Sequence, residues 1–291
     1  MGTTAEIRVG GLADPTPALD AAFAALGRVD DRMSLWKESE LAALNRTGHG
    51  IVSAETFAVV RHALDVAAAS KGAFDPTVEP LVRAAGGFGE PARSPNAEEK
   101  RELLARVGYQ NVHLDDAVRT VHLAAGARLV LDALAKGHAA DLALSALRDA
   151  GATSGLVDLG GSSLAAFGED MTIDLSDPTG RGLPWAAFRV ATAVGTSGSD
   201  QQPGHILDPR TGEPPRGVLQ ATVVAPSALE ADALSTAVLV LGAADGLALV
   251  RRRGAAGLVV FLENGHRVVR TTPGFSAAHS LVAAPGVEVR E

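Results

Sequence analysis

Cysteine is absent from this chain of 291 residues. Its absence excludes disulfide bonds, thiolate catalysis, zinc–thiolate sites and a lipid-modified N-terminal cysteine, so any metal ligand must be an oxygen atom or an imidazole. Lysine is also scarce, with 4 residues against 22 arginines, and the formal net charge is −8. Because the arginines form no basic stripe in the sequence, nucleic acid is not expected as a partner.

Long apolar runs are missing as well. No window approaches the roughly 20 uninterrupted apolar residues that cross a bilayer, so stable membrane insertion is not expected. The segment from Met1 to Val9 is typical of a strand rather than of a signal peptide. The sequence as given therefore predicts a cytoplasmic protein, although an exported form whose leader has been removed fits it equally well.

Aromatic residues make up only 4% of the chain, whereas 46% of all residues are hydrophobic. The core must therefore be built mainly from small aliphatic side chains, and 291 residues suffice for one large domain or two small ones. We find no internal repeat, charge run or clear linker, so one composite α+β domain is the simplest prediction.

Helical spacing of apolar residues and capping residues predict the main helices. Ser53 is expected to cap a helix that stops at Gly72, and Ser227 with Glu230 matches a capping box for a helix that reaches Leu241. A hairpin is predicted around Glu263-Asn264-Gly265. The segment 128–131, the helix that follows it and the strand 155–159 suggest a βαβ-like unit.

One segment combines hydroxyl, glycine and imidazole groups, namely Thr196-Ser197-Gly198 followed by His205 to Gly212. Small residues let backbone N–H groups approach an anion, and a neutral imidazole can accept a proton, so such a loop suits phosphate chemistry. The alternative is a solvated loop with common turn formers.

Three further positions have both a functional and a structural interpretation. Asp232 and Thr236 are four residues apart and share a helix face, so their oxygens could bind Mg²⁺, or Asp232 could complement the positive helix end. Lys136 could neutralise a phosphate or be solvated. Trp36 could cover the core or offer a surface to an aromatic ligand ring.

Several familiar catalytic motifs are missing. The sequence has no G-x-x-x-x-G-K-[ST] phosphate loop, no H-E-x-x-H zinc pair and no G-x-S-x-G nucleophile elbow. A triad of Ser197, His205 and Asp208 is improbable, because the acid would have to fold back on its own turn.

Eight short segments, taken in order, resemble the FAD:protein FMN transferase family, the ApbE proteins. The resemblance covers nearly the whole chain, and eight matches in the correct order are specific even though each is short. The segments are Met1-Gly2-Thr3-Thr4; Ser34-Leu35-Trp36 with Ser39-Glu40-Leu41 and Asn45; Gly72 to Val78; Ala135-Lys136-Gly137-His138-Ala139-Ala140-Asp141; Asp158-Leu159-Gly160-Gly161; Thr196-Ser197-Gly198; His205 to Gly212; and Ala225 to Ser227 through Ala231 to Ala237.

The resemblance implies an α+β fold, a single composite T-fold-related domain over residues 1–291 with mixed or antiparallel sheets and packed helices. It also implies binding of FAD and a divalent cation, usually Mg²⁺. The FMN half is then transferred to a Thr or Ser hydroxyl of a partner flavoprotein, and AMP is released.

The resemblance also implies roles for individual residues. His205 becomes the base that deprotonates the acceptor hydroxyl. Around the flavin nucleotide it places Met1, Trp36, Ala73, Phe74 and Asp75; near the phosphates it places Lys136, Thr196, Ser197 and Leu207. Asp232 and Thr236 become metal ligands, with Ser235 and the backbone carbonyl of Ala133.

Three features depart from the family pattern. Val130 stands where an aspartate is usual, Ser162 where Asn or Asp is frequent, and the segment 199–204 is shorter than in many members. Two alternative functions therefore stay open: hydrolysis of FAD to FMN and AMP with water as the acceptor, and non-catalytic binding of FAD.

Overall fold

The computed structural model describes residues 2–91, 93, 95–124, 126–177, 184–198 and 206–291. The chain divides into two compact units. The first unit comprises Met1, Arg28–Ala135 and Gln202–Pro215, and the second comprises Gly2–Gly27, Lys136–Gln201 and Arg216–Glu291. The expectation of a single domain stays a prediction.

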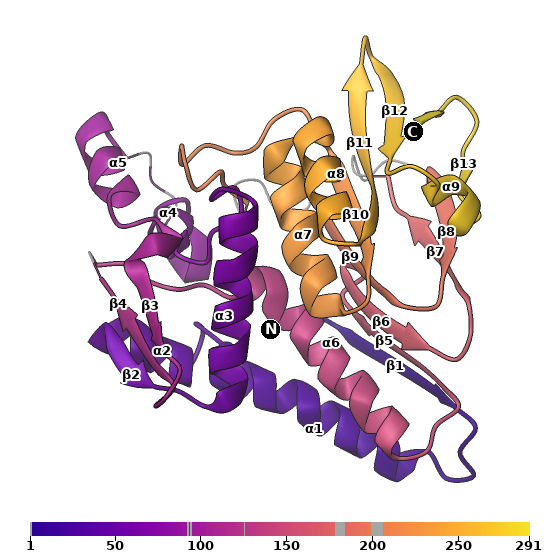
Figure 1. Ribbon diagram of the computed structural model, residues 1–291, viewed down its shortest axis with the longest axis horizontal. Helices are drawn as coiled ribbons and strands as arrows, with labels where there is room; N and C mark the ends of the chain where they lie inside the picture. Colours follow the sequence, from indigo (N-terminus) through magenta and orange to yellow (C-terminus); the bar gives the residue numbers. More distant parts are fainter. Residues whose placement is uncertain (1, 92, 94, 125, 178–183, 199–205) are drawn as a thin grey trace. The chain divides into compact units, whose positions relative to one another are not determined.

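A mixed eight-stranded sheet is the centre of the second unit (Figure 1). Neighbouring strands are antiparallel, except that the last pair is parallel. In order across the sheet the strands are β1 (Ala5–Gly10), β5 (Ser154–Leu159), β6 (Ser163–Phe167), β9 (Ala193–Gly198), β10 (Gln220–Ala225), β11 (Ala256–Glu263), β12 (His266–Thr271) and β14 (Glu288–Arg290).

Helices pack on this sheet because its central strands are apolar on both faces. All six residues of β10 are buried, which requires cover on both sides. Helix α7 (Ala228–Leu241) packs on β9 and β10, and α8 (Ala243–Arg252) packs on α7 and β11. Helix α6 (Asp132–Asp149) has most of its length in this unit, as does α1 (Thr16–Met33).

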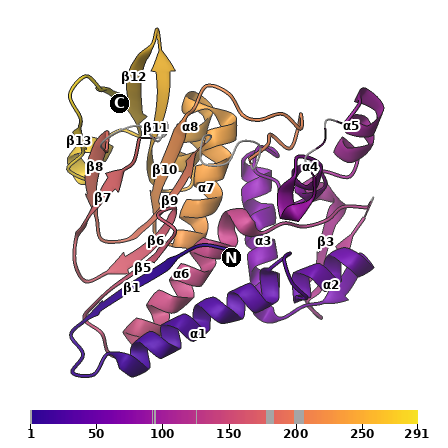
Figure 2. The same ribbon diagram turned by 180° about the vertical axis from the view of Figure 1, so that it is seen from behind.

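A smaller sheet completes the second unit, with strand order β13 (Val282–Ala283), β8 (Ala186–Val190) and β7 (Met171–Leu175). Figure 2 shows it beside α9 (Phe275–Ala278). Trp185, Phe188 and Phe275 fill the core there, and the Trp185 indole N–H donates to the Ser176 carbonyl over 2.7 Å. Three of the chain's few aromatic residues thus concentrate in one cluster.

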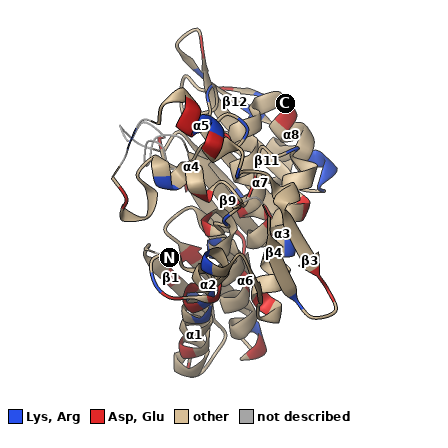
Figure 3. Cartoon of the chain, turned by 90° about the vertical axis from the view of Figure 1, so that its left-hand side faces the viewer, with Lys and Arg blue, Asp and Glu red and all other residues tan. Residues whose placement is uncertain are grey.

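The first unit contains a three-stranded sheet, two 3-10 helices and α-helices of 6 to 16 residues among its described residues. The strand order is β2 (His49–Ile51), β4 (Thr120–Leu123) and β3 (Val112–Asp115), and the 3-10 helices are η1 (Gly87–Gly89) and η2 (Tyr109–Asn111). The α-helices are α2 (Glu40–Thr47), α3 (Ala54–Ala69), α4 (Glu79–Ala84) and α5 (Ala97–Leu104). Acidic and basic residues are interspersed along α5 and do not form a patch of one sign (Figure 3).

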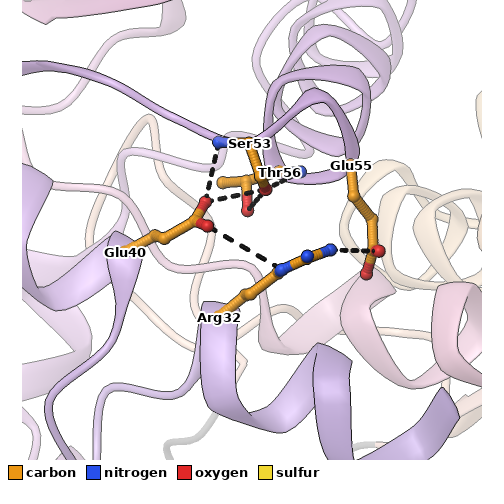
Figure 4. Close-up of polar contacts among 5 residues, drawn as sticks. All are labelled: Arg32, Glu40, Ser53, Glu55 and Thr56. Atoms are coloured by element: carbon orange, nitrogen blue, oxygen red, sulfur yellow. Dashed lines mark hydrogen bonds and ion pairs between the residues drawn. The ribbon is translucent and has the colours of Figure 1, made fainter.

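One carboxylate joins the N-termini of α2 and α3 (Figure 4). Glu40 accepts hydrogen bonds from the Ser53 N–H at 3.0 Å and the Ser53 hydroxyl at 2.8 Å, and Ser53 Oγ in turn accepts from the Thr56 N–H. Arg32 pairs with both Glu40 and Glu55. The predicted cap at Ser53 is confirmed, and it is part of a network that fixes α3 to α2.

Two local predictions need correction. The Ser227 side chain caps α7 as predicted. In a capping box the Glu230 carboxylate would accept from the Ser227 N–H, but here it accepts two hydrogen bonds from the Arg253 guanidinium and forms a tertiary ion pair. The βαβ-like unit is wrong, because 128–131 forms no strand and β5 is antiparallel to both of its neighbours.

The α+β prediction is confirmed by this mixture of helices with antiparallel and mixed sheets. Within the described ranges, no helix combines the length and the apolar character that crossing a membrane requires.

Candidate functional site

Asp232 is the buried charge at the centre of a polar cluster in the second unit. It lies in the second turn of α7 and is only 5% exposed. Its Oδ2 accepts hydrogen bonds from the Ser163 hydroxyl at 2.7 Å and from the Gly137 N–H at 2.8 Å. Burial raises the pKa of Asp232 to about 7, against the opposing effects of Ser163, Lys136 and Gly137. A positive charge beside this carboxylate would therefore be stabilising.

Three hydroxyl groups meet where the end of β9 packs against the part of α7 that carries Asp232. Ser197 Oγ lies 2.8 Å from Ser235 Oγ and 3.1 Å from Thr236 Oγ1, and the Ser235 hydroxyl also donates to the Asp232 carbonyl at 2.9 Å. The structure thus brings together Asp232, Ser235 and Thr236 with Ser197, as one face of α7 against the end of β9. Thr196 pairs instead with Thr222 on β10, at 3.1 Å.

Lys136 is held at the same end of the second unit. Its ammonium group donates to Ser162 Oγ at 2.6 Å, the side chain is half-buried, and it interacts electrostatically with Asp232. The ammonium is therefore positioned by the fold and not freely solvated.

Close backbone packing makes this cluster possible. A Cβ on Gly195 of β9 would lie 2.6 Å from the Asp232 nitrogen, and a Cβ on Gly137 of α6 would lie 2.8 Å from the Leu229 nitrogen. Glycine at both positions lets β9 and α6 approach α7 directly. The Asp141 carboxylate accepts the N–H groups of Ala228 and Leu229 at 2.8 and 2.9 Å and so caps α7 from α6.

The oxygen atoms of this cluster fit a hard divalent cation. One carboxylate with several hydroxyls suits Mg²⁺, which binds through one or two carboxylates and retains waters. In the described part of the chain, no three His, Asp or Glu side chains are gathered as a metal site. A cation at Asp232 would therefore depend on hydroxyl and carbonyl oxygens for its other protein ligands.

The other described residues that the resemblance places around FAD belong to the first unit. Ala73, Phe74 and Asp75 are buried, as is Leu207, whereas Trp36 is 66% exposed and packs its ring 5.8 Å from that of Phe88. The interpretation of Trp36 as a cover over the core is therefore wrong. Ala133 lies in the first turn of α6, and the role of its carbonyl stays a prediction.

Asp75 is fixed by its neighbours. It accepts hydrogen bonds from the N–H and hydroxyl of Thr77 and from the Tyr109 N–H, at 2.9, 2.6 and 2.8 Å. Burial raises the pKa of this carboxyl, and these hydrogen bonds oppose the shift. The segment Gly72 to Val78, one of the eight that carry the resemblance, is thus held to the first residue of η2.

Comparison with known families gives the decisive observation, since the model of the ApbE family matches residues 1–259. The chain belongs to the ApbE family. A relative from Treponema pallidum (strain Nichols), named FAD:protein FMN transferase, is 32% identical over 299 residues, which cover 90% of this chain and 82% of that protein. A relative of the same name from Vibrio cholerae is 30% identical over 312 residues, covering 94% and 87%.

Solved structures of ApbE proteins have the same fold. The flavin transferase ApbE from Vibrio cholerae matches with a TM-score of 0.85 at 26% identity, covering 95% of this chain and 96% of that one. The ApbE protein from Thermotoga maritima matches with a TM-score of 0.82 at 29% identity, covering 98% and 94%. The resemblance stated from the sequence segments is therefore confirmed.

Two of the assigned residues of this ApbE protein, Met1 and His205, lie outside the described residues. Their roles stay predictions. The sequence analysis also missed three contributors to the polar cluster: Ser163, the Gly137 N–H and Asp141. Gly137 and Asp141 belong to a segment that carried the resemblance and are four residues apart, so the sequence could have placed both on one face of the same helix. No sequence pattern pointed to Ser163.

Thr77→Val tests the rigidity of the Asp75 segment. The Thr77 hydroxyl accepts from the Gly108 N–H at 2.7 Å while it donates to Asp75, and Thr77 is fully buried. Valine has the same shape but leaves that N–H without an acceptor, so we expect a loss of about 1–3 kcal/mol in unfolding free energy, measured in urea. Thr172→Val, at an exposed strand position of β7, should change it by less than about 0.5 kcal/mol. Equal effects of the two variants would contradict a buried hydrogen-bond relay.

Proposed function

We propose that this flavin transferase of the ApbE family is Mg²⁺-dependent, transfers the FMN half of FAD to a Thr or Ser hydroxyl of a partner flavoprotein, and releases AMP. The observation that supports the proposal most is the position of Asp232. This buried carboxylate accepts from the Ser163 hydroxyl, shares one helix face with Ser235 and Thr236, and interacts electrostatically with Lys136. Cation and phosphate chemistry need this combination of charges.

The reaction dictates what these residues must do. The acceptor oxygen forms a bond to the FMN phosphorus, the bond from that phosphorus to the AMP oxygen breaks, and AMP leaves with the electron pair. Negative charge grows on the nonbridging and leaving oxygens, so positive groups there lower the barrier. A Mg²⁺ ion held there would polarise the phosphate oxygens and neutralise this charge.

The described residues supply binding and charge. Asp232 and Thr236, with Ser235, would hold the cation, and the fixed Lys136 ammonium would pair with a phosphate oxygen. The Ala133 carbonyl completes the proposed ligand set. His205 is proposed to accept the proton of the acceptor hydroxyl.

The flavin contacts proposed for the first unit involve Met1, Trp36 and the segment 73–75, and Leu207 is proposed to lie near the phosphates. Exposure of the Trp36 ring supports its part in this assignment, because an exposed indole can stack on an aromatic ligand ring.

The proposal is tested by incubating the purified protein with FAD and Mg²⁺, with and without an acceptor flavoprotein domain. AMP release and the mass of the acceptor are followed. An FMN adduct that depends on the acceptor would support the transferase. AMP without an acceptor would favour hydrolysis of FAD, and bound FAD without AMP would favour a non-catalytic binding protein.

Lys136→Met should raise the KM for FAD by about 10- to 100-fold, because the loss of a charge-assisted hydrogen bond costs about 1.5–3 kcal/mol. The methionine keeps the length of the side chain and removes the charge. Lys71→Met removes a charge from an exposed position of the first unit and should leave KM unchanged. A wild-type KM in Lys136→Met would remove the phosphate role of this lysine.

A further inference from the structure

Three exposed histidines lie side by side on the β2–β4–β3 sheet of the first unit. His122 of β4 stands directly opposite His49 of β2 on one side and His113 of β3 on the other. All three are exposed, whereas Val112 and Val121, their neighbours along the strands, are buried. Because successive side chains of a strand point to opposite faces, the three imidazoles share the solvent face of the sheet.

The backbone hydrogen bonds fix how close these side chains can come. The Leu123 N–H donates to the Gly48 carbonyl at 2.7 Å, so the adjacent pair, His49 and His122, is a non-hydrogen-bonded pair. In such pairs the Cβ atoms are about 4.5–5.5 Å apart. On the other side, the ring centroids of His113 and His122 are 6.2 Å apart, with the ring planes inclined by 31°.

This geometry suits a transition-metal ion. Neutral imidazole is a preferred ligand of Zn²⁺, Ni²⁺ and Cu²⁺, and Zn–N bonds are about 2.0–2.1 Å long. An ion between two neighbouring rings can therefore reach a nitrogen of each after small rotations, which exposed side chains make at little cost. The side chains as they stand do not form a three-ligand site, so a third histidine must turn inward when the ion binds.

We propose that His113 and His122 bind one transition-metal ion, with His49 turning in as the third ligand and water filling the remaining positions. This site differs in chemistry from the oxygen cluster around Asp232, because it offers nitrogen ligands and carries no buried carboxylate. It lies wholly on the first unit and does not depend on the proposed transfer reaction.

The test is an isothermal titration calorimetry experiment in which Zn²⁺ is added to the full chain. The protein carries no affinity tag, and Mg²⁺ is present in excess. The wild type should bind Zn²⁺ at this site, and His122→Ala should weaken that binding at least about tenfold, since even loss of a group supporting a ligand costs 10–100-fold. The control is His266→Ala, which removes an exposed histidine of the second unit and should bind like the wild type. Equal affinities of His122→Ala and the wild type would overturn the proposal.

A second measurement separates ligation from indirect effects. Zn²⁺ that binds the folded state should raise the melting temperature of the wild type and of His266→Ala, and should do so much less in His122→Ala and His113→Ala. Cu²⁺ bound to the wild type should show nitrogen couplings in its electron paramagnetic resonance spectrum, and their persistence unchanged in His122→Ala would contradict the site. FMN transfer in Mg²⁺ should be the same in His122→Ala as in the wild type, so failure of either proposal can be told from failure of the other.

Discussion

Asp232→Asn is expected to lower the rate of Mg²⁺-dependent FMN transfer by about 10²–10³-fold. A cation that stabilises charge at the reacting phosphate contributes several kcal/mol, and each 1.36 kcal/mol corresponds to a factor of ten. Asparagine keeps an oxygen that can accept from Ser163 and Gly137 but removes the negative charge that would bind the cation. The rate is measured with saturating FAD and acceptor over a range of Mg²⁺ concentrations.

Stability distinguishes this loss from misfolding. The substitution removes a buried charge, so in Mg²⁺-free buffer Asp232→Asn should unfold at a temperature no lower than the wild type. Mg²⁺ should raise the melting temperature of the wild type but not that of the variant. Asp149→Asn, on the exposed end of α6, is the matched control and should keep wild-type activity and the Mg²⁺ response. Full transfer activity in Asp232→Asn would remove Asp232 from the proposed metal site.

Gly195→Ala should destabilise the second unit by about 3 kcal/mol or more, a decrease in melting temperature of about 6–12 °C. The new methyl group would lie 2.6 Å from the Asp232 nitrogen and closer still to the Ala231 carbonyl. These are backbone atoms of a buried helix and cannot rotate aside, so β9 and α7 must separate. The hydroxyl cluster of Ser197, Ser235 and Thr236 spans this contact, and transfer activity should fall with stability.

Fluorescence can report this unfolding locally. Trp185 is buried in the second unit, so unfolding is followed in a Trp36→Phe background, in which Trp185 is the remaining tryptophan. Gly27→Ala is the control, because its Cβ would meet nothing within 4 Å on an exposed position of α1. That variant should gain about 0.5–1 kcal/mol, as alanine favours helix over glycine. Unchanged unfolding of Gly195→Ala would mean that β9 and α7 do not pack as closely as described.

Local sequence signals predicted many of the elements correctly. The helix capped by Ser53 is α3, the helix capped by Ser227 is α7, and the turn at Glu263-Asn264-Gly265 joins β11 to β12. Caps, apolar periodicity and hairpin turns act over a few residues, so they can be read without the fold. The same reasoning placed Asp232 and Thr236 on one helix face.

Local sequence signals gave wrong predictions where a residue or strand far away in the sequence supplies the hydrogen-bonding partner. Glu230 was expected to close a capping box, but Arg253 offers two hydrogen bonds to its carboxylate. Thr196-Ser197-Gly198 suggested a loop, yet these residues end strand β9, because β10 and β6 supply its hydrogen-bonding partners. The apolar run 128–131 resembled a strand but has no neighbouring strand to pair with among the described residues.

The sequence by itself determined the α+β class, the helix caps, the main hairpin and the family, since eight ordered segments specify the ApbE resemblance. Only the tertiary structure decided which groups meet. Ser163 and Gly137 are 69 and 95 residues from Asp232 in the chain, yet both donate to its carboxylate. The three histidines of the first unit likewise align only through strand register. Such contacts depend on how β9, α6 and α7 pack and on how the strands pair. A local sequence pattern cannot predict them, because the residues that meet are far apart in the chain.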